Sequence, residues 1–357
     1  SSMVAFIISM SITHTVVDAI PGIYLGAPDA GTELSVLPGH KMLLIGEGHN
    51  AVKLTVIGSF MSLLLSVILI PILVPMVKLI YPVLKDYIGW ILVVVISFMI
   101  LKDRNRYWNF VLFAMSGILG MVVLNIPNTK QVLFPLLSGL FGFSILITSL
   151  KEKTIIPKQD PRKKLEIKKS IIANSTLGAT IVGFMAAFLP GFGSSQAAIL
   201  AQQFLRNIGD KGFLILVGGI NTVNMALSLV TLYVLDKARN GSIVAISKIA
   251  EQFDLDLFLI SICSILITGG AAVFLSLNIS KLFSKVITKV NYQKLILIII
   301  SFVTILVFLF SSWIGLVILI TSTCVGLVAA LKGVGKNHLM GSLILPVILF
   351  FLLYTFI

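Results

Sequence analysis

A polar stretch inside a long apolar run, Leu189-Pro190-Gly191-Phe192-Gly193-Ser194-Ser195-Gln196, has the residue types of an anion-binding site. Pro190 and Gly191 would end one helix, and a second helix-forming segment starts directly afterwards at Ala197. The free N–H groups and the macrodipole at a helix start favour an anion. Inside a membrane, such a break persists only where protein buries it or where it lines a wet cavity. The simpler alternative is a kink that only helps neighbouring helices to pack.

The groups of this stretch that could donate hydrogen bonds to an anion are backbone amides, two hydroxyls and one side-chain amide. They belong to Gly191, Gly193, Ser194, Ser195 and Gln196. Donors of this kind at a helix start suit a carboxylate without a buried Lys or Arg. We therefore predict that these residues bind substrate, as discontinuous helices do in many secondary transporters.

Two further pairs of polar residues lie in apolar runs. Asn221 and Asn224 are three residues apart and could form a second wall of the substrate site or coordinate a cation through their carbonyl oxygens. Hydrogen bonding between helices is the alternative role for both. His14 and Asp18 are four residues apart and share one helical face. Ionisable groups inside a membrane are functional candidates, although this pair could instead be satisfied locally.

The polar passage that follows the first apolar run contains further candidates. Its Gly31-Thr32-Glu33 junction has the composition of a helix start with Thr32 as N-cap. Asp29, Thr32 and Glu33 could serve cation coupling, or they could be solvated loop residues. The full set of candidates for coupling to Na⁺ or H⁺ is His14, Asp18, Asp29, Thr32 and Glu33. No cofactor is expected, and because Cys263 and Cys324 each lie in an apolar run, no disulfide or Cys-based metal site is indicated.

The composition excludes an ordinary soluble globule. Hydrophobic residues make up 57% of the 357 residues and charged residues 11%, and the mean hydropathy is +1.07. A spanning helix needs roughly 20 mostly apolar residues, and the sequence supplies about ten such windows. The net charge of +13 comes from Lys and Arg between apolar runs, which indicates membrane orientation and not nucleic-acid binding. We expect an all-α, multi-pass protein of the cell membrane that contacts lipids and has about 10–12 membrane segments.

The two halves of the chain resemble each other as inverted repeats. Apolar spans that start near residues 51, 88, 108 and 132 recur near 255, 295, 313 and 340, a shift of about 205 residues. Between the halves lies a connection with eight Lys or Arg and three Asp or Glu. The predicted organisation is a first membrane repeat over residues 1–150 that lacks its first hairpin, a basic cytoplasmic linker over 151–169, and a second repeat over 170–357.

The positive-inside rule gives the two repeats opposite orientations. If the linker is cytoplasmic, the Lys and Arg of residues 102–106 are also inside, as are those of 281–294 and of 332–336. The nearly uncharged Ser311-Ser312 turn is then outside. Equivalent spans run in opposite directions on this count, an architecture with discontinuous helices that is typical of secondary transporters.

Several motifs in order resemble one family, the archaeal branch of the large membrane subunit of tripartite tricarboxylate transporters (TctA-like). In the second half these motifs are the run from Leu189 to Ala198, Gly219-Ile220-Asn221-Thr222-Val223-Asn224 and Lys237-Ala238-Arg239-Asn240-Gly241. In the first half they are Leu25-Gly26-Ala27-Pro28-Asp29 and Ser35-Val36-Leu37-Pro38-Gly39-His40. The family's first-half Pro-Gly motif would precede residue 1, so half of any symmetric site cannot be assigned here.

The resemblance implies a function and partners. In that family the large subunit is the transport pore, a small membrane subunit accompanies it, and an extracytoplasmic binding protein delivers a carboxylate. The resemblance also implies that an ion gradient, and not ATP, drives transport. The expectation is therefore a secondary transporter for a small organic anion that works by alternating access and is not an enzyme.

Two other functions stay open at this point. A translocase for a polyprenyl-phosphate-type lipid would also use a helix start, because such a site binds phosphate as readily as carboxylate. An intramembrane enzyme could use His14, Asp18, Asp29, His40 and His49, but the sequence contains no His-Glu-x-x-His pattern.

Overall fold

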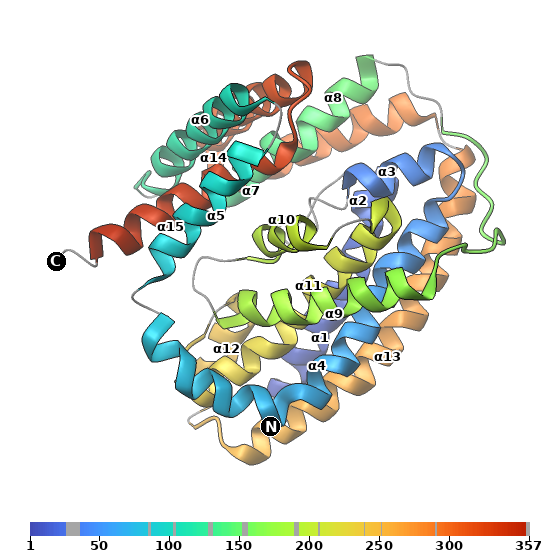
Figure 1. The fold of residues 1–357 in the computed structure, drawn as a ribbon. Coiled ribbons are helices and arrows are strands. Elements are labelled where there is room, and N and C mark those ends of the chain that lie inside the picture. Colours follow the sequence, from blue (N-terminus) through green and yellow to red (C-terminus); the bar gives the residue numbers. More distant parts are fainter. Residues whose placement is uncertain are drawn as a thin grey trace. The chain divides into compact units, whose positions relative to one another are not determined.

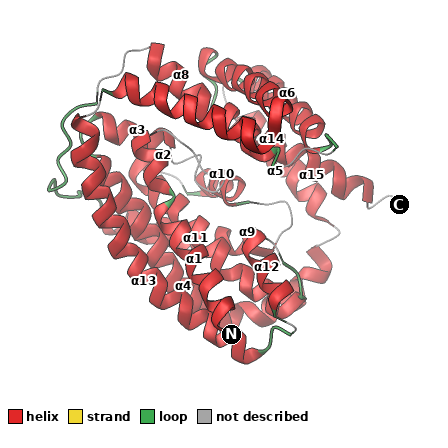
Figure 2. Ribbon diagram, turned by 180° about the vertical axis from the view of Figure 1, so that it is seen from behind, coloured by secondary structure: helices red, strands yellow, loops and turns green. Residues whose placement is uncertain are grey.

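The computed structural model is helical and spans a membrane many times. It describes residues 1–25, 36–84, 87–102, 105–127, 131–151, 156–188, 193–205, 208–238, 240–250, 252–289 and 291–354. Within these ranges helices are joined by turns and loops, and no strand occurs (Figure 2). Nine of the helices described are long and apolar enough to cross a membrane, and Gly89–Leu101 is a shorter apolar helix. The prediction of an all-α, multi-pass membrane protein is confirmed.

The helices form two compact units, each of which takes segments from both halves of the sequence. The first unit contains α1 (Ser2–Val17), α2 (Ala19–Leu25), α3 (Val36–Leu44), α4 (Gly48–Leu84), α9 (Lys169–Phe188), α10 (Ser194–Phe204), α11 (Gly209–Leu235), α12 (Gly241–Ile249) and α13 (Leu255–Val286). The second contains α5 (Ile88–Lys102), α6 (Arg106–Leu124), α7 (Leu133–Leu137), the π-helix η3 (Ser138–Phe143), α8 (Ser144–Lys151), η4 (Ile287–Lys289), α14 (Tyr292–Leu331), η5 (Lys336–Met340) and α15 (Gly341–Tyr354).

Helix α11 is the centre of the first unit. It packs against α4 and α9 most extensively and also contacts α1, α10 and α12 (Figure 1). In the most apolar 18-residue segment of α11, 94% of the segment is buried, whereas the corresponding share for α4 is 22%. A helix that is hydrophobic on all sides and enclosed by other helices can carry polar side chains away from lipid. Helix α11 is therefore suited to hold the Asn pair predicted from the sequence.

Small residues let α11 approach α4 closely. Gly58 of α4 lies against the backbone of Ile215, and Gly218 of α11 lies against the backbone of Thr55, so a Cβ at either glycine would clash. Ser59 Oγ donates a hydrogen bond to the carbonyl oxygen of Gly218 over 3.0 Å. Lipid provides no hydrophobic force between helices, and close packing with interhelical hydrogen bonds supplies the association energy instead.

A second stripe of small residues joins α13 to α1 and α2. The buried residues of α13 recur every three or four positions, which places them on one face. Thr268 Oγ1 bonds Ser9 Oγ over 2.9 Å, and Ser276 Oγ donates to the carbonyl oxygen of Val16 over 3.4 Å. These contacts hold α1, and with it His14 and Asp18, beside the rest of the first unit.

In the second unit, helices from the first half of the sequence pack against helices from the second half. Helix α15 packs on α6, and α14 packs on α7, η3 and α8. The sequence predicted two spans where α14 forms one helix with a non-helical residue, Ser312, whose φ is 54° and ψ −154°. The span from Gln293 to Leu331 has 39 residues, about 58 Å of helix against a hydrocarbon core of about 30 Å. The break at Ser312 therefore divides α14 into two arms of spanning length.

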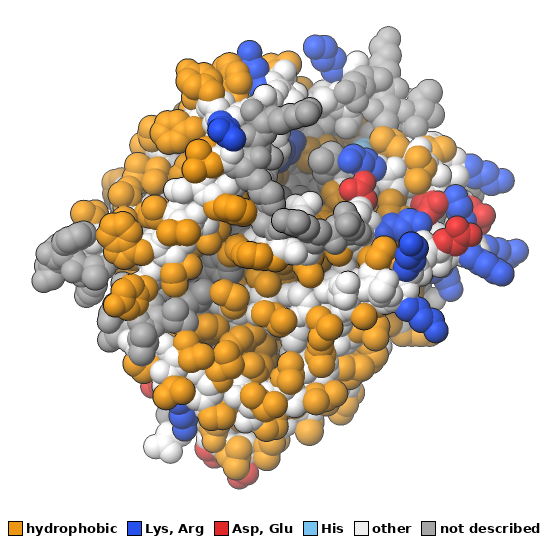
Figure 3. Space-filling model, viewed as in Figure 1, with side chains coloured by type: hydrophobic (Ala, Val, Ile, Leu, Met, Phe, Trp, Pro, Cys, Tyr) orange, Lys and Arg blue, Asp and Glu red, His pale blue; other side chains and the backbone are white. Residues whose placement is uncertain are grey.

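The outer surface is that of a membrane protein. Hydrophobic side chains cover most of the face shown in Figure 3, and charged side chains gather along part of its edge. Ile68, Ile267 and Phe274 are 71, 76 and 74% exposed. Large apolar patches of this kind are unusual on soluble monomers and are expected where lipid covers the protein.

The described part of the connection between α8 and α9 is fastened to the turn between α3 and α4. Gln159 Nε2 donates to the carbonyl oxygen of Leu43 over 2.8 Å, and Gln159 Oε1 accepts from the amide of Gly48 over 2.9 Å. Lys163 Nζ lies 2.6 Å from Glu47 Oε1. The Lys163 ammonium beside Glu47 holds the pKa of that carboxyl below its usual value.

Replacing Gln159 by Met should detach this connection. The amide of Gly48 and the carbonyl of Leu43 would lose their buried partner, which costs about 1–3 kcal/mol. We expect a lower thermal unfolding midpoint and faster tryptic cleavage at Lys158 and Arg162. Lys164→Met, a change at an exposed residue, is the control, and equal cleavage of both variants would show that Gln159 is not the anchor.

The ion pair between Glu47 and Lys163 should make this attachment dependent on pH. Because the folded-state pKa of Glu47 is lowered, the contact stabilises the fold at pH above the ordinary Glu pKa of about 4.3. This stability is lost as the pH falls through the lowered pKa. Hydrogen exchange of residues 157–163, corrected for intrinsic rates, should report less protection at low pH in the wild type and a weaker pH dependence in Lys163→Met. Parallel pH profiles for the two proteins would contradict this prediction.

Candidate functional site

Three helices of the first unit bring distant polar residues together. Helix α1 carries His14, and Asp18 lies at the junction of α1 and α2. Helix α11 carries Asn221 and Asn224 one turn apart. Helix α10 begins at Ser194 after the extended residue Gly193, as the break in the sequence predicts for a new helix start.

Four of these side chains form a continuous hydrogen-bonded chain. Asn221 Nδ2 donates to Asp18 Oδ2 over 2.7 Å. Ser194 Oγ donates to Asn221 Oδ1 over 3.4 Å, a long contact, and accepts from Asn224 Nδ2 over 3.0 Å. The chain links residues predicted for substrate binding with one predicted for cation coupling.

The carboxyl group of Asp18 determines how Asn221 is oriented. Asp18 is 7% exposed, and Asn221 is 8% exposed. The amide nitrogen of Asn221 donates to Asp18 Oδ2, and its carbonyl oxygen therefore faces Ser194 and accepts from that hydroxyl. A change in charge at Asp18 would therefore be felt at the hydroxyl of Ser194 through one intervening side chain.

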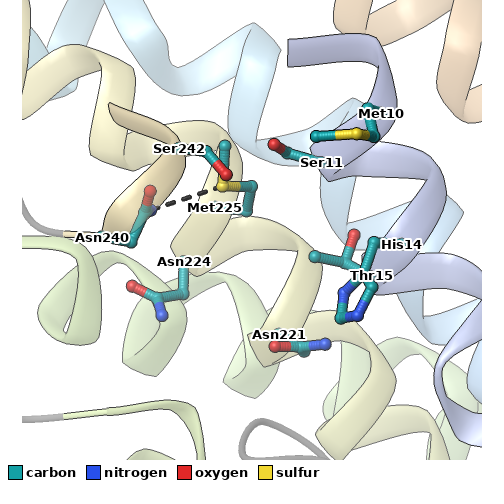
Figure 4. Close-up of a pocket in the computed structure, with 9 residues that line it drawn as sticks. All are labelled: Met10, Ser11, His14, Thr15, Asn221, Asn224, Met225, Asn240 and Ser242. Atoms are coloured by element: carbon teal, nitrogen blue, oxygen red, sulfur yellow. Dashed lines mark hydrogen bonds between the residues drawn. The ribbon is translucent and has the colours of Figure 1, made fainter. Parts of the chain in front are cut away.

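A cavity of about 380 Å³ lies beside this hydrogen-bonded chain, between α1, α11 and the start of α12 (Figure 4). Its size falls within the range of about 300–1,000 Å³ that is typical of small-molecule sites. The residues that line it are Met10, Ser11, His14, Thr15, Asn221, Asn224, Met225, Asn240 and Ser242. None of these described lining residues is Lys or Arg, and the cavity offers amide, hydroxyl and imidazole groups with two thioethers.

The structure describes only part of the predicted site. Gly191, Asp29, Thr32 and Glu33 lie outside the described residues. Of the second part of the motif, Gly193 precedes α10, Ser195 is 1% exposed, and Gln196 belongs to α10 but its side chain is not described. The residues brought together are therefore Asp18, Ser194, Asn221 and Asn224, with His14 at the cavity.

Sequence reasoning did not assign Asn240 and Ser242 to the site. Asn240 caps α12, because its Oδ1 accepts from the amide of Ile243 over 2.9 Å, and its Nδ2 contacts Met225 Sδ over 3.3 Å. The signal was present, since Asn240-Gly241-Ser242 is a good helix start. It places a second helix start beside the cavity. Met10 and Met225 carried no comparable signal, because Met is an ordinary residue of an apolar helix.

No arrangement for metal chemistry was found in the described ranges. Among these residues, no group of three or more His, Cys, Asp or Glu is placed to hold a metal ion. The first unit assembles a hydrogen-bonded chain next to a cavity that is lined by amide, hydroxyl, imidazole and thioether groups. Such an arrangement can bind and orient a small polar molecule.

Comparison with known proteins assigns the family. Residues 1–341 match the tripartite tricarboxylate transporter TctA family. An uncharacterized protein of Methanocaldococcus jannaschii is 30% identical over 358 residues, which cover 98% of this chain and 88% of that protein. No solved structure matches the chain. The match extends over nearly the whole chain and confirms the resemblance indicated by the motifs, and we conclude that this membrane protein belongs to the TctA family of tripartite transporters.

Proposed function

We propose that this chain is a secondary transporter that moves a small organic anion, a carboxylate, across the membrane by alternating access. Membership in a transporter family supports transport in general. The observation that carries the finer proposal is the hydrogen bond from Asn221 to Asp18, because it joins the cavity to a buried acidic group. The two membrane repeats would move about this site during transport.

The cavity suits an anion that is bound by neutral donors. Asn224 and Ser242 line the cavity with side chains that can donate hydrogen bonds, and the starts of α10 and α12 contribute the favourable end of the helix dipole. Neutral donors release a carboxylate more easily than a buried ion pair would, because no charge is left uncompensated when the ligand departs. A transporter needs such release on every cycle.

Asp18 gives a physical reason for cation coupling. Two unit charges about 7 Å apart repel each other by about 2 kcal/mol at an effective dielectric constant of about 20. This corresponds to roughly 30-fold in affinity. A carboxylate in the cavity would be repelled by ionised Asp18 and would bind more tightly once Na⁺ or H⁺ neutralises that group. Coupling of this kind needs no cofactor.

The proposed partners follow from the family. A tripartite system implies a small membrane subunit and an extracytoplasmic binding protein beside the transporting subunit. The exposed apolar surface implies membrane lipids as the surroundings of the spans. The test of the function as a whole is uptake into proteoliposomes of a panel of carboxylates, with polyprenyl phosphates as the competing class, under a sodium or proton gradient. Transport of polyprenyl phosphates alone would replace the proposal by a lipid translocase.

Replacing Asn221 by Leu should weaken carboxylate binding by at least tenfold. The change removes a lining amide, together with the donor to Asp18 Oδ2 and the acceptor of the Ser194 hydroxyl, and the loss of a buried hydrogen bond costs about 1–3 kcal/mol. Equilibrium binding of the transported carboxylate, measured on protein that elutes as a single species, gives the comparison. Thr222→Val on the same helix is the matched control, because Thr222 Oγ1 bonds Gly218 within α11. Unchanged affinity in folded Asn221→Leu would place the substrate elsewhere.

Replacing Asp18 by Asn should uncouple binding from the cation. At neutral pH and without Na⁺, the variant should bind the carboxylate roughly 30-fold more tightly than the wild type does under the same conditions, because the repulsion is removed. Its affinity should then approach that of the wild type in the presence of Na⁺. Titrations with and without Na⁺, and at two pH values, measure this change. Asp254→Asn, at an exposed helix start, should leave the cation dependence intact. A variant at Asp18 that keeps the full cation dependence would contradict the coupling role.

A further inference from the structure

A lysine in the second unit reaches into the helix bundle. Lys336 is the first residue of η5 and lies at the start of the span from Lys336 to Leu353. Its Nζ donates to Ser144 Oγ over 2.8 Å. Ser144 is fully buried and is the first residue of α8. It precedes Lys151, the last residue of α8, by seven residues, and this separation corresponds to about 10 Å of helix rise. A lysine at a helix end normally extends toward water, whereas this one extends toward the interior of its unit.

The hydrogen bonds of Lys336 leave donors available. The hydroxyl of Ser144 donates to the carbonyl oxygen of Leu140 over 2.7 Å, so its oxygen accepts from Lys336. A lysine ammonium has three N–H groups, and the bond to Ser144 uses one of them. The other two N–H groups can each donate to a further acceptor. None of the described side chains of this unit is a carboxylate that could serve as that acceptor.

The charge around Lys336 is positive. Within the residues described for the second unit there is no Asp or Glu. The four acidic residues of its sequence lie outside the described ranges, and they are Asp29, Asp86, Asp103 and Glu152. Lys332, four residues earlier, lies over the ring of Trp108 with its Nζ 4.4 Å from the centroid. A partly buried ammonium without an anionic partner is unfavourable, because it loses hydration without a compensating charge.

The backbone directly before Ser144, the partner of Lys336, forms a π-helix. The π-helix η3 ends directly before Ser144, and π-helical turns inside α-helices occur often at such sites. Gly326 of α14 packs against the backbone at Leu140 and against Ser144 Cβ. This contact holds the Ser144 hydroxyl in place, so the position of the Lys336 ammonium is preorganised.

We propose that Lys336 and Ser144 form a binding site for an oxyanion, a phosphate or carboxylate group, in the second unit. The anion accepts hydrogen bonds from the two ammonium hydrogens that Ser144 leaves available, and charge-assisted bonds of this kind are the strong ones. The site uses residues of the second unit only, so it is distinct from the cavity lined by Asn221. The anion is either free in solution or the headgroup of an anionic lipid.

The test uses the full chain in phosphatidylcholine nanodiscs, with inorganic phosphate as the probe. Phosphate should raise the thermal unfolding midpoint of the wild type and of Lys294→Met, an exposed lysine of the same unit. In Lys336→Met the apparent phosphate affinity should fall at least tenfold, because the charged donor is gone. Lys336→Gln serves as a second variant in case the Met variant does not fold. Asn221→Leu should keep the full response, which separates this site from the proposed substrate site.

A second arm identifies the source of the anion. Nanodiscs that contain phosphatidylglycerol should raise the midpoint without added phosphate and suppress the response to phosphate if a lipid headgroup occupies the site. An unchanged phosphate response in those nanodiscs assigns the site to a soluble anion. The proposal is overturned if folded Lys336→Gln responds to phosphate as the wild type does. It is also overturned if the wild type responds to neither probe.

Discussion

The close contact between α4 and α11 is the constraint on which the candidate site depends. Helices in lipid gain nothing from hiding apolar surface from each other, so they associate where small residues allow backbones to meet. Gly58 and Gly218 provide that contact, and Ser59 bonds across it. With α11 enclosed in this way, Asn221 and Asn224 can lie inside the unit without facing hydrocarbon. A bulky residue at either glycine would separate the helices and move the two amides.

Polar chemistry is distributed differently in the two units. In the first, a buried carboxyl group at Asp18 is connected by Asn221 to a cavity whose described lining contains no Lys or Arg. In the second, a lysine bonds a buried hydroxyl within a region whose described residues include no carboxylate. In the two proposals, a carboxyl group beside the proposed substrate site favours a cation as co-ligand, and an ammonium group in an apolar unit favours an anion. Charge and burial together, and not residue type alone, lead to these opposite assignments.

The sequence predicted those features of the structure that the thickness and apolar nature of the bilayer determine. Apolar windows of spanning length located the helices, and the break at Pro190-Gly191 predicted the new helix that starts at Ser194. It was less informative about how helices combine. The division of the sequence into two membrane repeats stays a prediction, and it did not indicate that each compact unit would take helices from both halves. Periodicity along a helix tells which face is polar, but it does not tell which other helix meets that face.

The sequence alone determined that the chain is a multi-pass helical membrane protein, and it identified Asp18, Ser194, Asn221 and Asn224 as residues of interest. Only the tertiary structure decided that Asn221 donates to Asp18 across 203 residues of sequence and that Asn240 lies at the same cavity. The reason is that hydropathy and helix-start signals act over one or two turns. A hydrogen bond between helices instead depends on the docking of whole helices, which small residues and packed volumes along their length determine together.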